Sequence, residues 1–159
     1  KYQLNGEQDN ILFYYNKNNN KFLQILSDVN IMNKNVTNII PIKMVFVLDR
    51  SGSMSGLRWN ELIKWTVLSL KKLRYDIDYY CVLFFDDKIE NITNNIIIAN
   101  EVNINKTIKY IKTLNVRGGT NINAGILAGI DVLKQNNIKG YYNKQIMFIT
   151  DGQANEGVT

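Results

Sequence analysis

The stretch "VFVLDRSGSMSG", residues 45–56, decides the fold. Its apolar run ends at Asp49 and is followed by three serines and two glycines. A continuous apolar run of this kind is typical of a strand buried on both faces of a parallel sheet. Small hydroxyl and glycine residues directly after such a strand indicate a tight turn. The stretch therefore predicts a central strand whose carboxyl end carries a loop rich in side-chain oxygen.

The elements around this strand alternate between helix and strand patterns. Apolar residues recur at helical spacing over 57–74, 104–114 and 121–135, while 79–85, 144–150 and, more weakly, 95–100 read as strands. Strands that alternate with helices pair in parallel through right-handed crossovers. We therefore expect an α/β fold, a doubly wound and mostly parallel sheet with helices on both faces. The expected core includes Phe46, Leu62, Leu70, Leu83, Ile108, Ile126, Ile130 and Phe148.

The residues before the only proline, Pro41, have a different pattern. Two apolar runs, 11–15 and 21–26, flank the polar turn "NKNNN", which predicts a β-hairpin. We therefore divide the chain into a hairpin extension, residues 1–40, and an α/β domain, residues 41–159.

Composition excludes several classes of function. No apolar run is long enough to span a membrane. The net charge of +5 mildly favours acidic partners, but the lysines are spread over helix faces, so nucleic-acid binding is not expected. The absence of histidine excludes Ser-His-Asp and Cys-His triads and His-ligated zinc. The single cysteine, Cys81, is interpreted as a small core residue.

Two strands of the predicted sheet end in a carboxylate, Asp49 and Asp151. Ligands of such sheets bind outside the carboxyl ends of the strands. If the loops converge there, the same rim carries the hydroxyls of Ser51, Ser53 and Thr120. This all-oxygen set suits Mg²⁺ or Mn²⁺, and Ca²⁺ less well. Taken singly, each of these residues could instead be a turn residue or a helix cap.

At these residues the sequence resembles the von Willebrand factor type A family and its metal-ion-dependent adhesion site. The family pattern D-x-S-x-S matches residues 49–53, its later threonine matches Thr120 in "GGTN", and its T-D-G matches residues 150–152. The resemblance covers residues 41–159 and is greatest to the branch of inter-alpha-trypsin inhibitor heavy chains. It implies a non-enzymatic binding module whose metal bridges to an acidic residue of a partner protein. In the family the serines and the threonine tend to contact the metal directly, and the aspartates often act through water.

Two features depart from the family pattern. Arg50 stands where the family usually has a small or apolar residue, and it either assists an acidic ligand or points away and pairs with an acid such as Glu156. Family domains also continue beyond the strand that ends at Asp151. We therefore expect the C-terminal part of the domain to be missing and residues 144–150 to form an exposed sheet edge.

Two rival functions stay open. A Mg²⁺-dependent phosphohydrolase would use the strand-end Asp49 as its nucleophile, but such enzymes resemble D-x-D, whereas residue 51 is Ser. A metal-free scaffold would contribute only packing surface to a larger protein. Nucleotide binding is disfavoured because the sequence contains neither of the glycine-rich phosphate-binding motifs, G-x-G-x-x-G and G-x-x-x-x-G-K-[ST].

Overall fold

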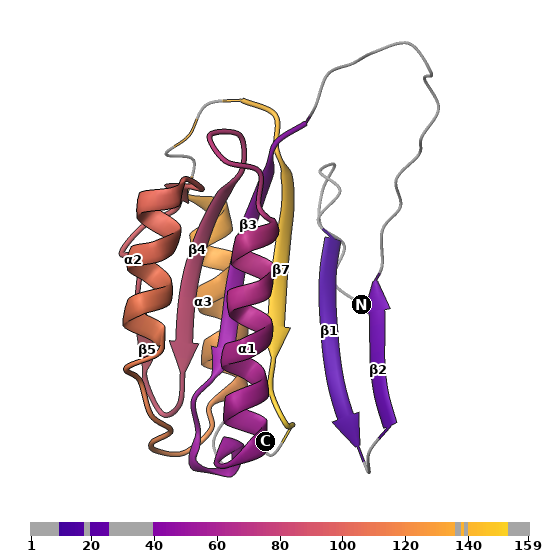
Figure 1. The fold of residues 1–159 in the computed structure, drawn as a ribbon. Helices are drawn as coiled ribbons and strands as arrows, with labels where there is room; N and C mark the ends of the chain where they lie inside the picture. The colour runs from indigo at the N-terminus through magenta and orange to yellow at the C-terminus, as the bar shows by residue number, and fades with distance from the viewer. Residues whose placement is uncertain (1–9, 18–19, 26–39, 136–137, 139, 153–159) are drawn as a thin grey trace.

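One sheet organises the molecule, with the strand order β2-β1-β7-β3-β4-β5 and the short β6 also paired to β4 (Figure 1). The computed structural model describes residues 10–17, 20–25, 40–135, 138 and 140–152. The strands are β1 Asn10–Lys17, β2 Asn20–Ile25, β3 Ile42–Asp49, β4 Tyr79–Phe85, β5 Ile89–Asn91, β6 Ile97–Ile98 and β7 Asn143–Ile149. The helices are the 3-10 turn η1 Gly52–Met54 and the α-helices α1 Leu57–Lys72, α2 Glu101–Ile111 and α3 Ile122–Lys134.

The strand of the opening stretch, β3, lies at the centre of the sheet. It pairs in parallel with β4 on one side and with β7 on the other, so that Val47 is level with Leu83 and with Phe148. Every residue from Val45 to Asp49 is buried. The doubly wound, mostly parallel sheet expected from the sequence is therefore confirmed.

The far edge of the sheet is antiparallel, which the sequence pattern did not predict. Both β5 and β6 run antiparallel to β4, and the strand expected over 95–100 is reduced to Ile97–Ile98. Only three residues separate β4 from β5. A connection this short can only return as a hairpin, because a parallel crossover needs a dozen or more residues.

The predicted hairpin is confirmed, since β1 and β2 pair antiparallel from Leu12–Ile25 to Lys17–Asn20. Its position corrects another expectation. β1 pairs in parallel with β7, from Asn10–Gln145 to Tyr14–Ile149, so β7 is an inner strand and not an exposed edge. The backbone of β1 offers the unpaired side of β7 a hydrogen-bonding partner that a sequence pattern cannot locate.

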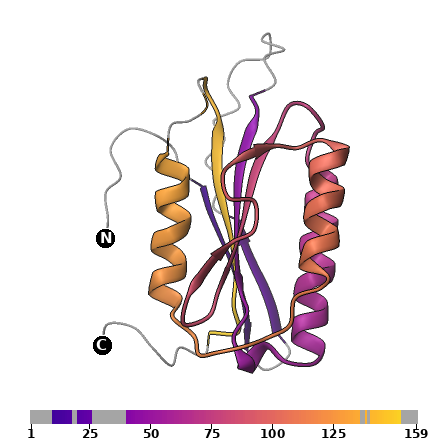
Figure 2. The ribbon, with the colours of Figure 1, turned by 90° about the vertical axis from the view of Figure 1, so that its left-hand side faces the viewer.

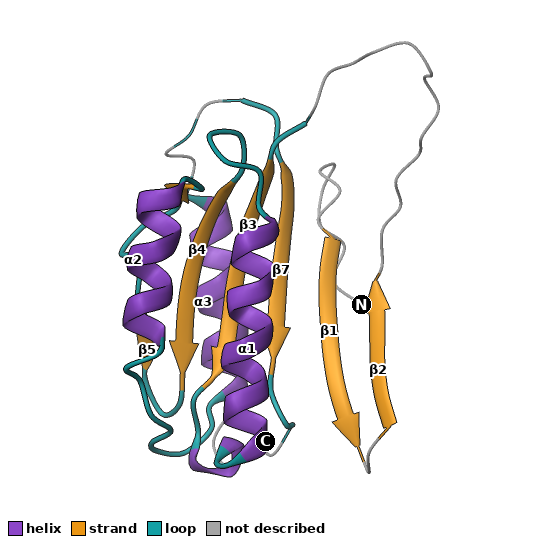
Figure 3. Cartoon of the chain, viewed as in Figure 1, coloured by secondary structure: helices purple, strands orange, loops and turns teal. Residues whose placement is uncertain are grey.

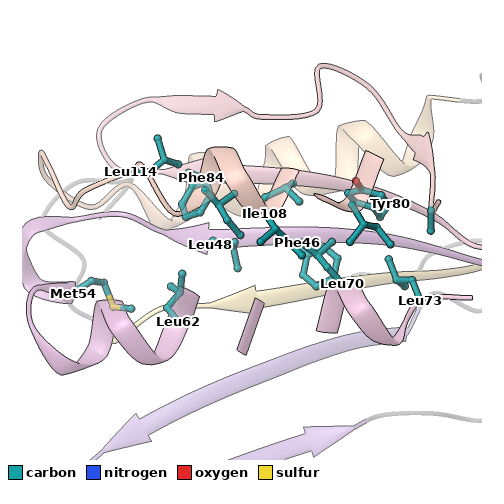
Figure 4. Close-up of a cluster of buried hydrophobic side chains, with 14 residues drawn as sticks. Phe46, Leu48, Met54, Leu62, Leu70, Leu73, Tyr80, Phe84, Ile108 and Leu114 are labelled. Carbon is teal, nitrogen blue, oxygen red and sulfur yellow. The ribbon is translucent and has the colours of Figure 1, made fainter. Parts of the chain in front are cut away.

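Helices cover both faces of the sheet. Figure 2 shows α3 on one side and α1 with α2 on the other. Alternate residues of β3 and β4 separate accordingly into two cores. Phe46, Leu48 and Phe84 pack against α1 and α2 (Figure 4), and Val45, Val47 and Phe85 pack against α3. Among the described residues, no helix has the length and apolar character needed to cross a membrane.

Six of the eight expected core residues are buried, and the two exceptions lie on α3. Ile126 and Ile130 are only partly buried because the helix meets the sheet through Gly125 and Gly129. A Cβ at Gly129 would lie 2.7 Å from Val47 Cγ2, and one at Gly125 would lie 2.9 Å from the ring of Phe85. Helix α3 thus lies closest to the sheet at Gly125 and Gly129, and Ile126 and Ile130 lie beside this contact.

Cys81 has the predicted structural role. It is fully buried in β4, and burial raises the pKa of its thiol to about 11. Because the thiolate is the reactive form, this cysteine is inert at neutral pH in the folded protein.

Candidate metal centre

The loops that follow β3 and β7 meet at the carboxyl edge of the sheet, at the lower end of Figure 3. Asp49, the last residue of β3, is fully buried. Its Oδ1 accepts a hydrogen bond from the backbone N–H of Ser51 at 2.8 Å, and its Oδ2 accepts one from Thr150 Oγ at 2.6 Å. Burial raises the pKa of Asp49, and the nearby carboxylate of Asp151 adds to that rise. The site therefore holds a carboxylate that would gain from a cation.

The two serines connect Asp49's loop to the end of β7. The turn η1 brings Ser51 Oγ and Ser53 Oγ to 2.9 Å from each other. Ser53 Oγ also donates to Asp151 Oδ1 at 3.3 Å. Residues that are 98 positions apart in the sequence thus lie in one hydrogen-bonded chain of oxygens.

Thr120 comes from a third loop, which is hydrogen-bonded to the first. The N–H of Gly52 donates to the carbonyl of Gly118 at 3.2 Å, and the N–H of Arg117 donates to the carbonyl of Arg50 at 2.8 Å. Gly118 has a φ of +68°, and a Cβ there would lie 2.5 Å from Asp87 Oδ1, so the tight turn requires glycine.

Among the residues that the structure describes, the hydroxyl of Thr120 has no hydrogen-bond partner, although Thr120 is 0% exposed. An unsatisfied buried hydroxyl is costly and rare in folded proteins. The alternative role of Thr120 as a helix cap is taken by its neighbour, because the side chain of Asn121 accepts the N–H of Ala124 at 2.9 Å. The described part of the chain therefore leaves the Thr120 hydroxyl buried without a hydrogen bond.

Arg50 points away from this rim. Its guanidinium donates to Glu90 Oε2 at 2.8 Å and to the carbonyl of Asn115 at 2.6 Å. Of the two orientations left open by the sequence, the structure has the one that pairs with an acid. That acid is Glu90 of β5, whereas Glu156 lies outside the described residues.

Two further arginines belong to the site, and the sequence patterns did not single them out. Arg117 donates to Asp86 Oδ2 at 2.6 Å and to Glu90 Oε2 at 2.8 Å, which ties the loop of Thr120 to β4 and β5. Arg58, in the first turn of α1, donates to Asp151 Oδ2 at 3.0 Å. The position of Arg58, in the first helical turn after the serine loop, could have indicated from the sequence that this side chain lies near the site.

The donor set is compatible with a small hard cation. It combines two carboxylates with three hydroxyls and contains no nitrogen or sulfur, which is the ligand chemistry that Mg²⁺ and Mn²⁺ accept. Within the described part of the chain, no group of three or more His, Cys, Asp or Glu side chains could hold a metal. A metal at this edge would therefore depend on the hydroxyls as well as on Asp49 and Asp151.

Comparison with known proteins gives one family. Residues 44–153 match the family profile of the von Willebrand factor type A domain. Inter-alpha-trypsin inhibitor heavy chain H1 of Homo sapiens is 31% identical over 150 residues, which covers 89% of this chain. The chain spans only 15% of the length of that relative.

Solved structures with the same fold include two from pili. The PilB minor pilin from Streptococcus sanguinis is 25% identical with a TM-score of 0.59, over 72% of this chain and 30% of that one. The pilus adhesin SpaC from Lactobacillus rhamnosus GG is 19% identical with a TM-score of 0.62, over 72% of this chain and 15% of that one. At 19% identity, the similarity to SpaC shows a shared fold only.

Proposed function

Because the chain belongs to the von Willebrand factor type A family, we propose that it is a protein-interaction module with a metal-dependent binding site. Asp49, Ser51, Ser53, Thr120 and Asp151 would hold Mg²⁺ or Mn²⁺. An acidic side chain of a partner protein would complete the coordination. When bound, the metal would supply a Lewis-acidic position for a carboxylate, a role in binding and not in catalysis.

The observation that carries the proposal is the buried, unpartnered hydroxyl of Thr120. A metal ligand is a use for such an atom that needs no further hydrogen bond from the protein. The second support is the raised pKa of Asp49, since a buried carboxylate near a second one gains when a cation arrives.

The charges explain why the partner group would be acidic. Three of the five proposed ligands are neutral hydroxyls. The two carboxylates can therefore at most balance the charge of a divalent ion. Each of them also accepts a hydrogen bond, Asp49 from Thr150 and Asp151 from Arg58, which reduces its effective negative charge at the metal. A further anion is then favourable at an open coordination position.

Substitution of Thr120 by Val tests the assignment with two readouts. Valine keeps the shape and removes only the hydroxyl, so the metal-free protein should gain about 1 kcal/mol of unfolding free energy because an unsatisfied buried group is lost. Calorimetry should show Mg²⁺ affinity falling by about tenfold or more, since even outer-shell partners are worth that much.

Thr66 offers a matched control. It is equally buried, but its hydroxyl donates to the carbonyl of Leu62 at 2.8 Å. Thr66→Val should therefore leave Mg²⁺ affinity unchanged and give no stabilisation. An unchanged affinity in Thr120→Val would remove Thr120 from the site. A partner captured equally well in Mg²⁺ and in EDTA would favour the metal-free scaffold.

A further inference from the structure

Arg58 forms its ion pair with a proposed metal ligand, Asp151, whereas Arg50 and Arg117 pair with Glu90. Its Nη1 donates both to Asp151 Oδ2 at 3.0 Å and to the carbonyl of Ser53 at 2.9 Å. The other carboxylate oxygen of Asp151, Oδ1, accepts the hydroxyl of Ser53. One carboxylate oxygen of Asp151 thus contacts Ser53, and the other contacts a permanently charged guanidinium.

The helix itself gives no reason for a cation at this position. Arg58 is the second residue of α1, where the positive end of the helix dipole disfavours a positive charge. The first turn of α1 contains no acidic residue, and its N-cap is Gly56 without a side-chain hydrogen bond. The contacts of Arg58 that the structure supplies are those to Asp151 and Ser53, both in the site.

The two side chains of the Arg58–Asp151 ion pair differ in their exposure to solvent. The side chain of Arg58 is 52% exposed, whereas that of Asp151 is 7% exposed. An exposed guanidinium on a flexible stem can turn into solvent at little cost, but the shielded carboxylate cannot. Arg58 is therefore the partner that can move when another cation competes for Asp151.

We propose that Arg58 is a tethered counter-cation, which occupies Asp151 when the site holds no metal and lowers the affinity of the site for metal. The inference rests on the proposed function. A divalent ion bound by the hydroxyls and Asp151 is repelled by a guanidinium on the same carboxylate. Metal loading therefore displaces Arg58 from Asp151 Oδ2, or proceeds against its repulsion.

Arg50 and Arg117 do not share this role. Both are directed to Glu90, which accepts them through the same oxygen at 2.8 Å. Arg58 is thus the guanidinium that the structure directs onto a proposed metal ligand.

Calorimetry with Mg²⁺ alone tests the proposal on Arg58→Gln, Arg58→Lys and the unsubstituted protein. At low ionic strength, Arg58→Gln should bind Mg²⁺ about three- to tenfold more tightly, because a unit charge a few ångströms from a partly exposed ion has an effect of that order. The ratio should shrink as salt rises, and Arg58→Lys should stay close to the unsubstituted protein. The matched control is Lys64→Gln, which removes the same charge from an exposed position of the same helix and should change affinity little.

A second readout is thermal unfolding, measured in EDTA and in saturating Mg²⁺. In EDTA, Arg58→Gln should not unfold at a higher temperature than the unsubstituted protein, whereas its stabilisation by saturating Mg²⁺ should be larger. Equal or weaker Mg²⁺ binding by Arg58→Gln would overturn the counter-cation role and leave the metal site standing. If neither protein binds Mg²⁺ or Mn²⁺, the metal site itself is wrong and this inference falls with it. Binding by Arg58→Gln alone would support the role most strongly.

Discussion

At the scale of single residues, Asp49 has the most constrained position in the candidate site. It is fully buried, and its Oδ1 accepts the N–H of Ser51 in its own loop while its Oδ2 accepts the hydroxyl of Thr150 at the end of β7. These two bonds replace only part of the water that a free carboxylate would bind. Asp49 therefore contributes both to the closure of the loops and to the charge that a metal would neutralise.

Asp49→Asn separates these two contributions. The amide oxygen can still accept the N–H of Ser51, so the fold should be retained with a loss of about 1 kcal/mol in unfolding free energy. Mg²⁺ binding should become undetectable by calorimetry because one of two carboxylates is lost and hydroxyls compete poorly with water. Asp131→Asn, on the exposed face of α3, is the control for net charge. Retained Mg²⁺ affinity in Asp49→Asn would exclude Asp49 as a ligand.

The residues of this site differ in how far the sequence could predict them. Asp49, Ser51, Ser53 and Asp151 follow strand patterns closely, and parallel strands bring their ends to one edge. The contacts of Arg58 and the orientation of Arg50 were not predictable, because each depends on a partner 40 or more positions away. The unpaired state of Thr120 is likewise a property of packing, which no local pattern contains.

At the scale of elements, the short strand β5 fixes the loop that carries Thr120. Glu90, in the middle of β5, accepts Arg50 and Arg117 through one oxygen. It thereby connects the loop after β3 to the loop before α3. The side chain of Arg50 is only 9% exposed, so its charge depends on this pairing.

Glu90→Ala should destabilise the protein through Arg50. The substitution leaves a buried guanidinium without its carboxylate, and we expect a loss of about 2 kcal/mol in unfolding free energy, measured by urea denaturation. Mg²⁺ affinity should also fall, because Arg117 in the loop of Thr120 loses one of its two carboxylates and keeps only Asp86. Glu61→Ala, at an exposed position of α1, should change neither quantity. A stable variant with normal Mg²⁺ affinity would show that β5 does not position the site.

The opposite end of the sheet depends on a second buried acid, Asp78. Its carboxylate accepts the N–H of Ile42, where β3 begins, and the guanidinium and N–H of Arg74, just after α1. Burial by itself would raise the pKa of Asp78, but these hydrogen bonds outweigh it and lower the pKa below its ordinary value.

This shift has a definite sign for stability. A carboxylate with a lowered pKa contributes stability above its unfolded value, near pH 4, and loses that contribution as the pH falls through the lowered value. Urea denaturation of the unsubstituted protein should therefore show a loss of stability below about pH 4. Asp78→Asn should be less stable at neutral pH and should lose less on acidification. Parallel curves for the two proteins would contradict this role.

At the scale of the whole molecule, the sheet combines two segments that sequence patterns treat separately. The alternation of strands and helices over residues 42–149 predicts β3, β4 and β7 with the helices between them. The hairpin of β1 and β2 is also predictable as a local unit. Its attachment to β7 is not, because the pairing joins residues more than a hundred positions apart and leaves no local trace.

The last prediction tests this attachment. A chain that begins at residue 40 lacks β1 and leaves one side of β7 without its backbone partner. Unpaired strand edges promote association with other chains, so light scattering should show this shortened chain aggregating at concentrations where the longer one does not. Urea denaturation should also show a lower unfolding free energy, since five residues of β7 lose their pairing with β1. A second variant is Leu12→Pro in the longer chain, because Leu12 is level with Met147 of β7 and with Ile25 of β2, and proline cannot donate to a ladder. It should reproduce part of the defect with every other residue in place. A shortened chain that stays monomeric and equally stable would mean that β7 does not need β1, and that the α/β unit from residue 40 onward is sufficient by itself.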